Sequence, residues 1–112
     1  MDFSQSAIDE AKLKYSHVER THFVEGDLFD GSIYDIKFDL IYDRAMWVAL
    51  PPSHQQKYID FCLSRLKSKG LFATITFNDT YSKEGPPWPV DLAMKTKYIS
   101  EQATLLLSLI HI

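Results

Sequence analysis

The sequence has little of several features that mark particular classes of protein. Its 112 residues contain a single cysteine, Cys62, so no disulfide can form within the chain, which fits a reducing, cytosolic setting. The formal net charge of -3 lacks the basic excess that a nucleic-acid or anionic-membrane partner requires. No apolar run approaches the ~20 residues that span a bilayer, and the first residues do not resemble a secretory signal. We therefore expect one small cytoplasmic domain that binds neither nucleic acid nor membrane.

The first half of the chain contains one helix pattern and two strand patterns. Apolar and small residues recur at helical spacing in 7–15, after serines that can cap a helix. The segment 21–25 (THFVE) predicts a short strand that ends at Gly26, and 38–43 (FDLIYD) predicts a second strand.

The second half continues the alternation. Ser53 followed by Gln56 predicts a capping box at the start of an amphipathic helix. We expect that helix to end at Gly70, with Lys67 and Lys69 near its negative end. A strand over 71–77 (LFATITF) and a short helix over 92–99, capped by Asp91, complete the pattern. Strands that alternate with helices predict an α/β fold with a mostly parallel sheet.

Polar residues follow each predicted strand, where open parallel sheets bind their ligands. Asp27 follows the first strand, Asp43 and Arg44 the second, and Asn78 the third. Spacing alone favours the simpler interpretation that such residues form turns and cap helices. Arg44 is harder to explain in that way, because the apolar run AMWVAL must bury itself directly after it. We expect Asp43 to compensate the arginine charge and leave the guanidinium available to a ligand.

Several motifs resemble the thiopurine S-methyltransferase family. DFSQSAIDEA, EGDLFD, FDLIYDRAMWVALPP and GPPWPV occur in the family's order and spacing, from Asp2 to about Tyr98. The resemblance implies a Rossmann-like methyltransferase fold that uses S-adenosyl-L-methionine. It also implies that this chain is incomplete, because the first strand, the glycine-rich loop and the last strands of that fold are missing. Two strands would then separate 21–25 from 38–43 in the sheet.

The resemblance assigns cofactor roles to four residues. Asp2 matches the carboxylate that binds the ribose hydroxyls, and Asp27 with Leu28 matches the pair that lies along the adenine. Core packing is the alternative for Leu28. Arg44 matches an arginine that lines both the cofactor and the substrate pocket.

Substrate contacts are implied for Arg44 and for the loop GPPWPV. Pro87 and Trp88 match the family's Gly-Pro-Pro-aromatic loop, in which the aromatic ring can wall an apolar acceptor. A rigid turn without ligand contact is the alternative. The histidines have no metal-ligand spacing, so we assign no metal, and in-line methyl transfer to a thiol requires no catalytic base.

The implied activity is methyl transfer to a small thiol or thiopurine by an enzyme that is monomeric at full length. Halide or bisulfide methyl transfer, a dehydrogenase fragment and an inactive remnant are alternatives. We expect a partial methyltransferase domain over 1–106 and an adapter-derived tail over 107–112, because LSLIHI matches a translated transposon end. We also expect that the 112 residues alone neither fold to the family structure nor bind the cofactor well.

Overall fold

The structure, a computed structural model, describes residues 4–30, 36–76 and 84–90. The chain divides into two compact units, Met1–Asp35 and Ile36–Ile112. The helix expected over 92–99 lies outside the described residues.

The first unit contains helix α1, Gln5–Lys14, close to the predicted bounds. Ser4 is its N-cap, and the Ser4 hydroxyl accepts a hydrogen bond from the amide of Ala7 at 3.3 Å. Ile8 is the buried residue of this helix. The serine cap and the helix are therefore confirmed.

The strand predicted over 21–25 is not formed. Residues 21–24 have no regular secondary structure, and only Glu25 makes an isolated bridge. A strand is stabilised by the hydrogen bonds of a paired neighbour, and a β-branched, aromatic sequence does not supply that neighbour by itself. The residue types therefore predict a strand, but the structure forms only the isolated bridge at Glu25.

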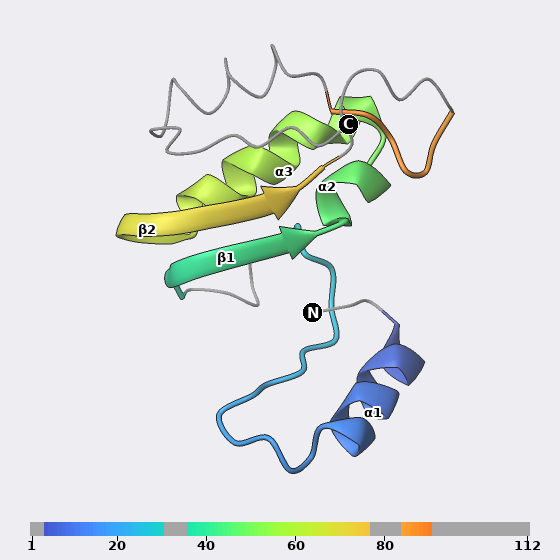
Figure 1. Ribbon diagram of the computed structural model, residues 1–112, viewed down its shortest axis with the longest axis vertical. Coiled ribbons are helices and arrows are strands. Elements are labelled where there is room, and N and C mark those ends of the chain that lie inside the picture. The colour runs from blue at the N-terminus through green and yellow to red at the C-terminus, as the bar shows by residue number, and fades with distance from the viewer. Residues whose placement is uncertain (1–3, 31–35, 77–83, 91–112) are drawn as a thin grey trace. The chain divides into compact units, whose positions relative to one another are not determined.

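The second unit is a strand–helix–helix–strand arrangement with a parallel pair of strands. It consists of β1 (Phe38–Arg44), α2 (Met46–Ala49), α3 (Pro52–Ser64) and β2 (Leu66–Ile75). Figure 1 shows the two strands side by side and pointing the same way, with α3 along them. Parallel neighbours require such a crossover, so the predicted α/β character is confirmed for this unit.

Helix α3 begins earlier and ends earlier than predicted. Pro51 is its N-cap and Pro52 its first residue, a position where the missing amide of proline costs nothing. The Ser53 side chain makes no cap and instead lies 3.1 Å from Nδ1 of His54, so the predicted capping box is wrong. The helix ends at Ser64, because the chain leaves it to pair with β1.

The lysines and glycine that were assigned to the helix end belong to β2. Between the pairs Phe38↔Leu66 and Leu40↔Leu71 the register shifts, and Lys69 adopts a φ of 65°. A Cβ at Gly70 would lie 2.9 Å from the carbonyl oxygen of Lys67. Gly70 is therefore required by the irregular start of a strand and not by a helix cap.

The core of the second unit lies on one side of the strand pair. Its buried apolar side chains come from α2, α3 and the segment 84–90: Trp47, Val48, Tyr58, Ile59, Cys62 and Val90. The other face carries large apolar side chains that are more than half exposed: Leu40, Tyr42, Leu71 and Ile75. No helix in the described part of the chain is long and apolar enough to cross a membrane.

Candidate cofactor and substrate site

Asp27 and Leu28 form a tight turn in the first unit. The Asp27 carboxylate accepts a hydrogen bond from the amide of Phe29 at 2.9 Å, and its carbonyl accepts one from Asp30 at 3.0 Å. Asp27 is exposed and Leu28 is half-buried. A carboxylate has two oxygens with several lone pairs, so this turn leaves acceptor capacity for a ligand donor beside an apolar side chain.

Asp43 and Arg44 do not form the expected ion pair. Successive strand residues point to opposite faces, so Asp43 is buried, with 3% exposure, while Arg44 is exposed. One carboxylate oxygen of Asp43 accepts from the amide of Met46 at 2.8 Å. The other accepts from the amide of Trp47 at 3.2 Å and from the hydroxyl of Thr74 at 2.9 Å. The Arg44 side chain is therefore accessible because it lies on the face of the strand opposite to Asp43, and not because Asp43 compensates its charge.

Two further titratable groups lie with Asp43 inside the second unit. Burial raises the pKa of the Tyr58 hydroxyl well above its ordinary value, and the nearby Cys62 and Asp43 raise it further. Burial also raises the pKa of the Cys62 thiol to about 11, although its hydrogen bond with Tyr58 opposes the rise. Tyr58 and Cys62 are therefore uncharged at neutral pH.

The segment 84–90 is held against the corner between α2 and α3. The amide of Trp88 donates to the carbonyl of Val48 in α2 at 2.6 Å. The buried side-chain amide of Gln55 donates to the carbonyls of Leu50 at 3.2 Å and Pro89 at 3.4 Å. Trp88 and the neighbouring Pro87 are half-buried, so the loop presents part of each ring to solvent.

Arg44 is the last residue of β1, just before α2, and the segment with Pro87 and Trp88 is hydrogen-bonded to Val48 of the same helix. Asp27 and Leu28 form their turn within the other unit, and Asp2 lies outside the described residues. The binding roles of these residues remain predictions.

Sequence reasoning missed Gln55 as the residue that holds the loop, because it assigned the neighbouring Gln56 to a cap. A polar residue at 55, in phase with the apolar Tyr58, Ile59 and Cys62, is the signal that could have identified it.

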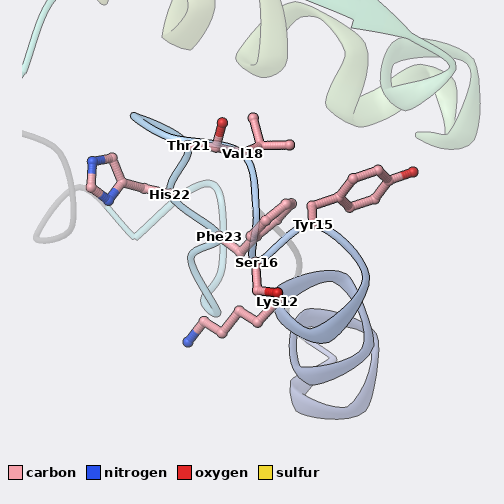
Figure 2. A pocket seen from close by; sticks show the side chains of 7 residues that line it. All are labelled: Lys12, Tyr15, Ser16, Val18, Thr21, His22 and Phe23. Carbon is pink, nitrogen blue, oxygen red and sulfur yellow. The ribbon is translucent and has the colours of Figure 1, made fainter.

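The described residues also form a further candidate site, whose lining is mostly exposed. A cavity of about 330 Å³ opens in the first unit beside the end of α1, as Figure 2 shows. It is lined by Lys12, Tyr15, Ser16, Val18, Thr21, His22 and Phe23. Tyr15 and Phe23 stack with ring centroids 6.0 Å apart, but most of the lining side chains are exposed. In the described ranges, no three His, Cys, Asp or Glu side chains are grouped to hold a metal ion.

A parallel strand pair joined by helices, with polar residues at the end of the first strand, defines an α/β protein with a parallel sheet. The family model described as Thiopurine S-methyltransferase (TPMT) matches residues 2–108. The chain therefore belongs to the thiopurine S-methyltransferase family, as its motifs indicated.

Individual relatives agree with this assignment. A thiopurine S-methyltransferase of Aliivibrio salmonicida (strain LFI1238) is 37% identical over 79 residues, which cover 67% of this chain and 37% of that protein. One of Aliivibrio fischeri (strain ATCC 700601 / ES114) is 35% identical with the same coverage. One of Legionella pneumophila (strain Corby) is 44% identical over 54 residues, which are 46% of this chain and 24% of the relative. The chain thus spans 37% or less of the length of these relatives.

Proposed function

We propose that this chain is part of a cytosolic, S-adenosyl-L-methionine-dependent methyltransferase with a Rossmann-like fold that methylates a small sulfur acceptor. The chief support is the match of residues 2–108 to the thiopurine S-methyltransferase family. The second support is that Arg44, at the end of β1, is exposed, and that Trp88 is hydrogen-bonded to α2, the helix that follows Arg44. Activity belongs to the intact enzyme, and the 112 residues alone are inactive.

The residues present suit the proposed cofactor. The exposed Asp27 carboxylate, held by its own turn, would accept hydrogen bonds from the adenine amine, and Leu28 would lie against the ring. Asp2 would accept from the ribose hydroxyls, as acidic residues do in dinucleotide-binding folds. The cofactor supplies an activated methyl group on a sulfonium centre.

The substrate side is assigned to Arg44, Pro87 and Trp88. The cationic guanidinium of Arg44 would stabilise an anionic thiolate. The rings of Pro87 and Trp88 would wall the apolar body of the acceptor. These residues would orient the acceptor sulfur in line with the methyl group, which is the main requirement of the displacement.

Replacing Asp27 or Arg44 tests the cofactor site. In the intact protein, we expect Asp27→Ala to weaken S-adenosyl-L-methionine binding by about 10- to 150-fold, because a hydrogen bond to a charged group contributes about 1.5–3 kcal/mol. We expect Arg44→Ala to weaken cofactor binding and also to raise the KM of an aryl thiol. Calorimetric titration and a radiolabelled methyl-transfer assay measure the two effects.

Glu19→Ala and Lys37→Ala are matched controls, because both residues are exposed and charged and neither has a proposed role. An intact protein without affinity for S-adenosyl-L-methionine would contradict the proposed function and favour an inactive remnant. Undiminished binding in both Asp27→Ala and Arg44→Ala would contradict the site. A preference for iodide over thiols as acceptor would favour a halide methyltransferase.

A further inference from the structure

Asp43 is a buried carboxylate that links three elements of the second unit, its own strand and two others. It belongs to β1, accepts from two backbone amides of α2, and accepts from the Thr74 hydroxyl of β2. Burying a carboxylate is costly unless hydrogen bonds compensate it, so these three donors are a condition of its position. The proposed site leaves this residue without a role.

The Asp43 hydrogen bonds close a sharp turn that carries Arg44. Between Arg44 and α2, Ala45 adopts a φ of 104°, in a region that is unfavourable for a non-glycine residue. The Asp43 side chain reaches past this turn to the amides of Met46 and Trp47. The turn is therefore held in an unfavourable backbone conformation by the residue directly before Arg44.

The hydrogen bonds of Asp43 also hold α2, the helix to which the backbone of Trp88 is hydrogen-bonded. The two backbone amides that donate to Asp43 belong to the first turn of α2. In the same helix, the carbonyl of Val48 accepts a hydrogen bond from the amide of Trp88 at 2.6 Å. A short run of direct hydrogen bonds thus leads from Asp43 through α2 to Trp88. Asp43 is the only residue of this run that also adjoins Arg44 in sequence.

We propose that Asp43 is a positioning residue for the acceptor, which sets Arg44 and Trp88 at a fixed separation by holding α2 against the end of β1. The inference rests on the proposed function of Arg44 and Trp88 as substrate residues. Asp43 itself contacts no substrate.

Asp43→Asn is the most direct test. The amide has one acceptor oxygen where the carboxylate has two, so in either orientation one amide of α2 loses its partner. In the intact enzyme we expect the KM of the thiol acceptor to rise about tenfold, since ~1.4 kcal/mol of lost positioning corresponds to that factor. Asp39→Asn is the control, because Asp39 lies on the same strand, is exposed, and pairs only with Lys67 at 3.2 Å.

A double-mutant cycle separates positioning from a general loss of structure. If Asp43 acts through Trp88, Asp43→Asn raises the acceptor KM about tenfold in the wild type but no more than about threefold in a Trp88→Ala background. Equal factors in the two backgrounds would overturn the inference, as would an Asp43→Asn enzyme that matches Asp39→Asn. A wild-type enzyme that transfers no methyl group would instead overturn the proposed function.

Thr74→Val provides a second test should Asp43→Asn fail to fold. This change removes one donor to Asp43 and leaves both α2 amides in place. We expect the acceptor KM to rise about threefold in the wild type and to stay unchanged in the Trp88→Ala background. An unchanged KM in the wild type would overturn the inference.

Discussion

The indole of Trp88 lies directly against the backbone of Gly85, three residues earlier in the chain. A Cβ at Gly85 would lie 2.4 Å from Cδ2 and 2.6 Å from Cγ of the ring. Carbon atoms do not approach so closely, so any side chain at this position must move the ring. Because the backbone of Trp88 is held by Val48, the ring and not the chain would have to give way.

Gly85→Ala is expected to displace the Trp88 ring and to raise the acceptor KM of the intact enzyme severalfold. Overpacking of this kind costs about 1–3 kcal/mol. Near-ultraviolet circular dichroism would report the ring, and methyl-transfer kinetics would report the acceptor. Glu84→Ala, at an exposed residue of the same segment, is the control. Unchanged kinetics with a displaced ring would mean that Trp88 does not contact the acceptor.

Residue types alone point to two of the proposed site residues, but not to the two residues that anchor them. Arg44 and Trp88 could be selected from the sequence because their motifs are distinctive. The anchoring roles of Asp43 and Gln55 could not, because each depends on backbone groups of α2 or of 84–90 that only the folded chain brings within reach. For the same reason, the predicted pairing of Asp43 with Arg44 is wrong.

At the scale of elements, two serines that look alike in sequence have different roles. Ser4 caps α1 through the amide of Ala7, whereas Ser53 lies inside α3 and caps nothing. Pro51 and Pro52 define the start of α3 instead, since their fixed φ suits the entry to a helix.

We expect Ser4→Ala to lower the free energy of unfolding by about 1 kcal/mol, the usual cost of losing a cap. Ser53→Ala should change it by less than about 0.5 kcal/mol, since surface substitutions usually do. Urea denaturation of the intact protein measures both. Equal losses in the two variants would contradict the assigned helix start.

The bounds of β2 show why element limits were harder to predict than element types. Lysines followed by glycine, at 67–70, are typical of a helix end, and the local pattern was read in that way. Pairing of Leu66 with Phe38 draws these residues into the strand instead. A long-range contact decided between two locally acceptable conformations, and such a contact has no signature within a short window of sequence.

At the scale of the whole chain, the strand pair has one covered and one exposed face. Leu40, Tyr42, Leu71 and Ile75 are 52–61% exposed. Parallel sheets are normally covered on both faces, and two strands form a marginal sheet in water. The alternation of helices and strands sufficed to predict the α/β class, but it could not show how much apolar surface the chain leaves in solvent.

We therefore expect the 112 residues, purified alone, to unfold without a cooperative thermal transition and to bind a hydrophobic dye. The exposed apolar face would be the cause, because burial of such surface contributes about 25 cal/mol per Å² to folding. Circular dichroism during heating and dye fluorescence are the measurements. A sharp transition together with tight S-adenosyl-L-methionine binding would refute the expectation.

The raised pKa of Cys62 has a consequence for the chemistry proposed here. With a pKa of about 11, the thiol holds its proton at neutral pH, and a protonated thiol is a poor nucleophile. In an enzyme that transfers a methyl group to sulfur, a reactive thiolate of the enzyme itself would compete with the acceptor. Protonation and burial therefore make this side chain a poor target for alkylation by the methyl donor of the proposed reaction.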